Sequence, residues 1–150
     1  MKYFNENIDN ETRRELHEEK IFFQKTEIVN PDFFVEDEQI FVLGGVEAKI
    51  IYTPGHTNSN ISVYIENEKV LYCGDLIVNG YMPNLEAGTK EDWKTWIDSL
   101  QKISKLEIDF IVPGHGNIIY GGETEKEIES IKKIILSAIE ENKAPTCKIL

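Results

Sequence analysis

The sequence predicts an α/β (α+β) domain, with most of its strands in the first half and most of its helices in the second. Runs rich in β-branched and aromatic residues recur between residues 20 and 78, and polar or glycine-containing turns separate them. Beyond residue 89, two stretches with apolar residues at helical spacing flank one short β-like run. Because 150 residues suit one hydrophobic core, residues 1–150 are treated as a single domain.

The composition limits the classes of partner. The formal net charge is −11, and a field of that sign repels phosphate backbones, so nucleic acid is not an expected partner. The sequence has no run with the length of a membrane span and no apolar region of a signal peptide at its start. Two cysteines, Cys73 and Cys147, do not make a disulfide framework. We therefore expect reduced thiols, a cytoplasmic location and no membrane partner.

The first third of the chain predicts mixed structure. Residues 10–20 favour an exposed helix, and residues 20–29 favour a strand. Asn-Pro-Asp at 30–32 breaks this run. Residues 33–45 then predict two short strands around the polar turn at 36–38.

The central third predicts a strand followed by a hairpin. Residues 46–56 form a β-like run with partial alternation of apolar and polar residues. Residues 60–78 contain two β-like runs separated by the polar turn Glu66–Lys69, which is typical of a β-hairpin.

A helix is predicted from Thr89, whose hydroxyl can cap the first turn together with Asp92. Its apolar residues recur at helical spacing, so this helix should pack on the rest of the domain through one face. They are Trp93, Trp96, Ile97, Leu100 and Ile103.

A short strand at residues 108–112 and a second helix complete the chain. Thr124 with Glu127 predicts a capping box at the start of this helix, and Pro145 marks its end. One apolar stripe runs along it. The stripe consists of Ile128, Ile131, Ile135 and Ile139.

Three of the β-like runs end in the same way, with a glycine followed by a potential metal ligand: His56, Asp75 and His115. Taken singly, each is also typical of an ordinary turn residue. If the three strands share one sheet, these side chains can converge beyond its edge. Two imidazoles and a carboxylate suit zinc, manganese or iron(II). A metal with an open coordination position lowers the pKa of its bound water to about 7, which makes a hydrolytic nucleophile.

The runs "TPGHT", "VLYCGDL" and "IVPGHG", in this order and spacing, resemble the later motifs of the metallo-β-lactamase superfamily. The helix between the second and third motifs is also similar to that family's, and the resemblance extends from about Phe33 to the C-terminus. It implies an αβ/βα sandwich that holds two zinc ions at one edge of its sheets. It also implies a hydrolase whose metal-bound hydroxide attacks an ester, thioester or lactam-like small molecule.

The resemblance assigns a role to each predicted ligand. His56 would bind the first metal, Asp75 would bridge both metals and orient the catalytic water, and His115 would bind the second. The expected metal is zinc, with iron or manganese as alternatives.

The sequence departs from the family in one respect. The motif H-x-H-x-D-H is absent from the 150 residues, and the remaining histidine, His17 in "ELHEEK", does not rebuild it. We therefore expect a partial domain, truncated in the N-terminal half of the fold, with reduced metal occupancy and impaired catalysis. The first alternative is a non-catalytic module that forms a homodimer, or binds a partner, through the uncovered sheet. The second is an enzyme with one metal held by His56, Asp75 and His115.

For several other residues the sequence allows either a structural or a functional role. Cys73 is either a thiolate ligand or a buried structural cysteine, and burial is the more common case. Trp93 and Trp96 are expected in the core of the helix interface rather than at a ligand. Tyr81 and Met82 follow the Asp75 strand and are candidates for the wall of a substrate cleft.

Overall fold

The computed structural model describes residues 30–86 and 88–145. The chain divides into two units, residues 1–34 and 35–150, and the second contains every described helix and strand. The helix and strand predicted before residue 30 lie outside the described residues. In the part of the chain that is described, no helix is both long and apolar enough to cross a membrane.

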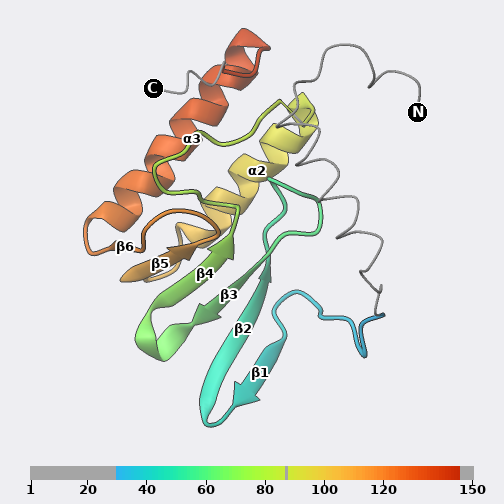
Figure 1. Cartoon of the computed structure of the whole chain (residues 1–150), viewed down its shortest axis with the longest axis vertical. Helices are drawn as coiled ribbons and strands as arrows, with labels where there is room; N and C mark the ends of the chain where they lie inside the picture. Colours follow the sequence, from blue (N-terminus) through green and yellow to red (C-terminus); the bar gives the residue numbers. More distant parts are fainter. Residues whose placement is uncertain (1–29, 87, 146–150) are drawn as a thin grey trace, which may run out of the picture. The chain divides into compact units, whose positions relative to one another are not determined.

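The second unit is built on one sheet of six strands in the order β1-β2-β3-β4-β5-β6 (Figure 1). The strands are β1 (Ile40–Leu43), β2 (Val46–Tyr52), β3 (Ile61–Ile65), β4 (Val70–Gly74), β5 (Phe110–Pro113) and β6 (Ile119–Tyr120). All neighbours pair antiparallel except β4 and β5, which are parallel. A parallel pair requires a crossover, and helix α2 (Lys90–Ile103) lies within it.

The predicted hairpin is confirmed as β3 and β4, joined by the short 3-10 helix η1 (Glu66–Glu68). The prediction of two strands in residues 33–45 is wrong, because β1 is the only described strand there. The polar turn itself is present, because the backbone N–H of Gln39 donates to the carbonyl of Glu36 (3.3 Å), but no described strand precedes it. Within the turn, Asp37 accepts a hydrogen bond from the backbone N–H of Tyr52 at the end of β2 (2.7 Å).

The capping box of α2 is confirmed. The Thr89 hydroxyl accepts from the backbone N–H of Asp92, and the Asp92 carboxylate accepts from the backbone N–H of Thr89. The capping role predicted for Thr124 is wrong, since α3 (Glu123–Glu141) begins one residue earlier, with Gly122 at its N-cap. The Thr124 hydroxyl is buried and instead lies within hydrogen-bond distance of the carbonyls of Gly121 (2.9 Å) and Ile108 (3.2 Å), and the second contact ties α3 to the segment before β5.

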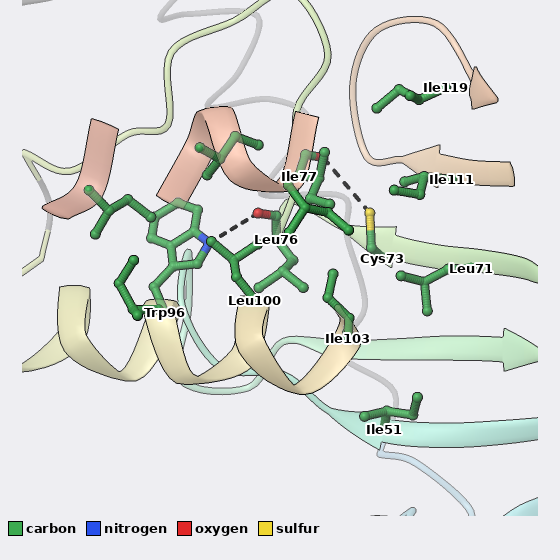
Figure 2. Close-up of a cluster of buried hydrophobic side chains, with 14 of the residues drawn as sticks. Ile51, Leu71, Cys73, Leu76, Ile77, Trp96, Leu100, Ile103, Ile111 and Ile119 are labelled. Atoms are coloured by element: carbon green, nitrogen blue, oxygen red, sulfur yellow. Dashed lines mark hydrogen bonds between the residues drawn. The ribbon is translucent and has the colours of Figure 1, made fainter. Parts of the chain in front are cut away.

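Both helices pack on the same face of the sheet (Figure 1). Tyr64, Leu71, Ile111 and Ile119 lie side by side across β3 to β6 and bury their side chains under the helices. Figure 2 shows strand residues of this core meeting Trp96, Leu100 and Ile103 of α2. The core therefore lies on one side of the sheet, directly behind the ends of β2, β4 and β5.

The opposite face of the sheet is apolar and carries no described helix. Alternation along the strands turns a row of large side chains to this side, and they are exposed. We call this surface the open face, and its residues are Tyr52, Ile61, Tyr72, Phe110 and Tyr120. A contiguous apolar surface of this kind is typical of an interaction surface.

Candidate metal-binding site

The three predicted ligands lie together at one edge of the sheet. Because β2 and β4 both run antiparallel to β3, and β5 runs parallel to β4, these three strands end at the same edge. The Asp75 carboxylate lies between the two imidazoles. Its Oδ2 is 3.6 Å from His56 Nε2, and its Oδ1 is 3.6 Å from His115 Nε2. Each carboxylate oxygen therefore faces a different histidine.

The loop after β2 brings His56 past the intervening strand β3. Asn60, directly before β3, donates from Nδ2 to the carbonyl and the hydroxyl of Thr53 (3.0 and 3.1 Å). The same amide reaches the carbonyl of Cys73 on β4 (3.4 Å). One side chain thus fastens the strand end that carries His56 to the strand end that carries Asp75.

Helix α2 packs against the turn that carries His56. Ser99 Oγ donates to the carbonyl of Pro54 (2.5 Å), and the backbone of Gly55 lies against the indole of Trp96. A Cβ at Gly55 would stand 2.6 Å from Trp96 Cγ, so this close approach requires glycine. The turn is therefore held by the buried face of the helix.

Trp96 also contacts the other side of the site. Its Nε1 donates to the carbonyl of Leu76 (3.0 Å), the residue after Asp75, as Figure 2 shows. Its ring meets the His56 imidazole edge to face, with centroids 6.1 Å apart. One indole thereby fixes the spacing between the first and second ligand turns.

The His115 turn packs directly on Asp75. The backbone N–H of Gly114 donates to the carbonyl of Gly74 (2.7 Å), which extends the pairing of β5 with β4 past the ends of the strands. On the far side of His115, its own carbonyl accepts from the backbone N–H of Asn79 (3.0 Å). His115 is consequently anchored by its backbone while its side chain stays exposed.

A cleft of about 430 Å³ opens at these ligands. Tyr81 and Met82 form part of its wall, so their predicted place at a cleft is confirmed. Trp96 is buried, as expected, but also forms the floor, a second role that helical spacing does not indicate. The lining residues are His56, Asp75, Val78, Tyr81, Met82, Pro83, Asn84, Trp96 and His115, and no lysine or arginine is among them.

The spacing of the donor atoms fits a metal ion. Zinc holds imidazole nitrogens and carboxylate oxygens at about 2.0–2.2 Å, so two such donors on one tetrahedral ion lie about 3.4 Å apart. The two 3.6 Å separations on either side of Asp75 are close to this value. Within residues 30–86 and 88–145, however, no group of three or more His, Cys, Asp or Glu side chains is arranged to hold one ion. The donors therefore form two pairs that share Asp75.

Cys73 lies in the core behind the site. Its side chain is fully buried, and Figure 2 shows its sulfur directed toward the carbonyl of Ile77. Burial raises the pKa of the Cys73 thiol to about 12. A protonated thiol in this position fits the structural interpretation of Cys73 rather than the ligand interpretation.

Comparison with known proteins decides the family. The model of the metallo-beta-lactamase superfamily matches residues 4–115, about three quarters of the chain. The chain belongs to the metallo-beta-lactamase superfamily. The match begins earlier than the resemblance at Phe33, and it ends at His115, before α3.

One similar superfamily member is a hydroxyacylglutathione hydrolase of Francisella tularensis subsp. novicida (strain U112). It is 32% identical to this chain over 87 residues, and the aligned region covers 58% of this chain and 34% of the relative. A beta-lactamase-like protein 2 homolog of Caenorhabditis elegans is 34% identical over 135 residues, which cover 85% of this chain and 42% of that protein. The chain thus spans less than half the length of these curated relatives.

The fold agrees with solved structures of the superfamily. A metallo-beta-lactamase family protein of Thermus thermophilus superposes with a TM-score of 0.66 at 23% identity, over 75% of this chain and 38% of that one. This likeness confirms the fold class. The part of the superfamily fold described here is one sheet with its two helices.

Several residues that build the site are not predicted by the sequence. Asn60 and Ser99 act through hydrogen bonds to backbone carbonyls of distant residues, which leave no spacing pattern in one sequence. The "TNSN" run that contains Asn60 follows the His56 motif directly and looks like an ordinary polar loop.

Proposed function

We propose that the chain carries part of the catalytic site of a metal-dependent hydrolase, with His56, Asp75 and His115 as metal ligands. The observation that carries this proposal is the Asp75 carboxylate, whose two oxygens each face one histidine at 3.6 Å. A bound metal supplies a hydroxide nucleophile at neutral pH. Asp75 is the residue that would hold and orient the attacking water at its carboxylate.

The proposed metal is zinc, with iron or manganese as alternatives, since imidazole and carboxylate donors suit all three. The proposed substrate is a small ester, thioester or lactam-like molecule. The name of the Francisella relative, hydroxyacylglutathione hydrolase, supports hydrolysis of an acyl compound. We further propose the cytoplasm as the location, on the basis of the two cysteines and their expected reduced state.

Catalysis by these 150 residues alone is proposed to be impaired. Three ligands divided over two metal positions give each ion two protein donors, whereas a catalytic zinc usually has three. The motif H-x-H-x-D-H, which supplies further ligands in the family, is absent from this sequence. Metal affinity should accordingly be lower than at a site with all its ligands.

Metal content tests the ligand assignment directly. The purified chain is loaded with zinc, dialysed, and analysed by mass spectrometry, alongside His56→Ala, His115→Ala and, as a matched control, His17→Ala. We expect zinc bound to the parent and to His17→Ala, and markedly less bound to the other two variants. Retention of zinc by both variants would show that these residues are not the ligands, and its absence from the parent would show that these three residues alone do not retain an ion through dialysis.

A second candidate function is supported by the open face. Its exposed aromatic side chains on β4, β5 and β6 favour a non-catalytic module that forms a homodimer. Light scattering across a range of concentrations, with Tyr72→Glu as the disrupting variant, tests this. A parent chain that stays monomeric at every concentration argues against self-association and leaves the metal proposal unaffected.

A further inference from the structure

The loop that carries His56 has two halves with different support. Its first half packs on the buried face of helix α2. Residues 57–59 form the outer half, and they are exposed. Among the described residues, one hydrogen bond reaches this outer half from outside the loop, and it runs from the Tyr52 hydroxyl to the carbonyl of Asn58 (2.5 Å). Tyr52 is therefore the link between the outer half of the loop and the sheet.

The turn at His56 depends on this outer half. The backbone N–H groups of Gly55 and Asn60 both donate to the carbonyl of Thr57 (3.1 and 3.3 Å). Thr57 stands between His56 and Asn58 in the chain. A movement of the Asn58 peptide therefore also displaces the acceptor that closes the turn around His56.

The backbone of Tyr52 is fixed by an ion pair. Tyr52 lies beyond the last pair of β1 with β2, which is Ile40 with Lys49. Its N–H donates to the Asp37 carboxylate (2.7 Å), and its carbonyl accepts from the Lys102 ammonium (3.3 Å). Asp37 and Lys102 are themselves paired at 2.8 Å. These two side chains thus take the place of a strand partner and fix the point from which the Tyr52 side chain extends.

The side chain of Tyr52 lies on the open face, on the side of the sheet opposite the helices. Its neighbour Ile51 is 2% exposed within the core, whereas Tyr52 is 44% exposed. The His56 loop is consequently contacted from both sides of the sheet. Ser99 and Trp96 reach it from the helix side, and Tyr52 reaches it from the open face.

We propose that Tyr52 is a positioning residue for His56, because its hydroxyl keeps the outer half of the loop in place and His56 Nε2 beside Asp75 (3.6 Å). The inference deepens the proposed hydrolase and rests on it for the role of His56 as a metal ligand. An exposed loop loses backbone freedom when it is ordered, and a fixed contact offsets part of that cost. A ligand on a mobile loop has to be ordered when the ion binds, which weakens binding.

Amide exchange, measured by NMR on the full chain without metal, tests the effect on the loop. Tyr52→Phe removes the hydroxyl and keeps the ring. Tyr72→Phe is the matched control, since Tyr72 lies on the same face and its hydroxyl has no hydrogen-bond partner among the described residues. The amides of Gly55 and Asn60 should exchange roughly twofold to tenfold faster in Tyr52→Phe, as expected for the loss of one hydrogen bond. The amide of Gly114, in the other ligand turn, should be unchanged in both variants.

A second measurement reports on His56 itself. Its imidazole meets the Trp96 indole edge to face, with centroids 6.1 Å apart, so the two rings should give a nuclear Overhauser effect. This signal should weaken in Tyr52→Phe and persist in Tyr72→Phe. Parental amide exchange in Tyr52→Phe would overturn the proposal, as would a Trp96 signal of parental intensity. Equally accelerated exchange at Gly114 would indicate general destabilisation and would overturn it too.

Zinc binding separates this proposal from the hydrolase proposal. The dissociation constant for zinc should rise by the same twofold to tenfold in Tyr52→Phe and stay unchanged in Tyr72→Phe. An unchanged constant alongside a mobile loop would show that Tyr52 orders the loop without positioning a ligand, which also overturns the proposal. A parent chain that binds no zinc counts against the hydrolase proposal, and the exchange and ring measurements then still decide whether Tyr52 positions His56.

Discussion

The backbone of Gly114 lies directly against the carboxylate of Asp75: a Cβ added at Gly114 would stand 1.9 Å from Asp75 Oδ1. It would also be 2.8 Å from the backbone carbon of Gly74, which cannot yield as a side chain can. The turn that carries His115 therefore packs closely against Asp75, the residue between the two histidines. Residue 114 therefore constrains the geometry of the site although it has no side-chain atom that could bind a metal.

Gly114→Ala should displace the Asp75 carboxylate and lower both stability and zinc content. Overpacking of this kind costs roughly 1–3 kcal/mol. Urea unfolding and mass spectrometry measure the two effects. Gly122→Ala is the matched control, because a Cβ there meets nothing within 4 Å and its φ of −64° suits alanine. Full zinc content in Gly114→Ala would contradict the expected displacement.

The contact of Gly55 with Trp96 predicts a non-additive pair. Gly55→Ala alone should destabilise the protein by roughly 1–3 kcal/mol, since its Cβ would overlap the indole. Trp96→Leu removes the overlapping ring, so adding Gly55→Ala in that background should cost much less. A double-mutant cycle of unfolding free energies measures the coupling. Additive costs would mean that the clash is relieved elsewhere.

Asn60 is expected to matter through its amide donor. Asn60→Asp keeps the shape but removes the N–H groups that reach Thr53 and Cys73, and places negative charge beside their carbonyls. Unsatisfied buried acceptors cost roughly 1–3 kcal/mol. Denaturant unfolding should show a loss of that order for Asn60→Asp and little change for Asn58→Ala, an exposed position in the same loop. Similar stability of the two variants would exclude a role for the amide.

The ion pair of Asp37 with Lys102 predicts a small acid dependence. Partial burial would raise the pKa of Asp37, but hydrogen bonds from the Lys102 ammonium and the Tyr52 amide outweigh it, so the pKa is lowered. A carboxyl group with a depressed pKa contributes stability above its unfolded pKa of about 3.9, and that contribution is lost as the pH falls through the folded pKa.

The size of this effect should be modest, on the order of 0.5 kcal/mol, because both side chains are more than one third exposed. Unfolding free energies of the parent and Asp37→Asn are compared at pH 7 and at pH 3. We expect the parent to be more stable at pH 7 and the difference to shrink at pH 3. A difference that is constant with pH would contradict the ionic contribution.

The buried thiol of Cys73 should be unreactive in the folded protein. Burial raises its pKa to about 12, and a shift of that size lowers the thiolate fraction at pH 8 by on the order of a thousandfold relative to a free cysteine. In a Cys147→Ser background, a thiol reagent should label Cys73 rapidly in urea and very slowly in native buffer. Fast stoichiometric labelling of the native protein would show that the sulfur is accessible.

The three proposed ligands are predictable from sequence because each one follows a β-like run that ends in glycine. That pattern identifies His56, Asp75 and His115, and the common direction of their strands brings them together. Hydrophobic spacing likewise predicts the buried face of α2, and a capping pair predicts its start. Such signals are local, and the physics behind them acts within one turn or one strand.

Other predictions fail where a distant partner decides the outcome. Thr124 has the sequence of a helix cap, yet its hydroxyl points to the carbonyls of Gly121 and the distant Ile108, and the helix begins one residue earlier. Residues 36–38 form the predicted turn, but no described strand precedes it, and Asp37 bonds to Tyr52 and Lys102. No pattern within either segment reveals these partners.

The parallel pairing of β4 with β5 also has a kinetic consequence. The strands β1 to β4 pair with sequence neighbours, whereas β5 pairs with β4 across the whole crossover that contains α2. Contacts of long sequence separation form slowly, because chain closure costs entropy before the contact stabilises anything. Asp75 and His115 are 40 positions apart, so we expect their meeting to be among the last folding events. A chain that has formed only its hairpins would have no place for a metal, and ion binding would then report completion of the fold.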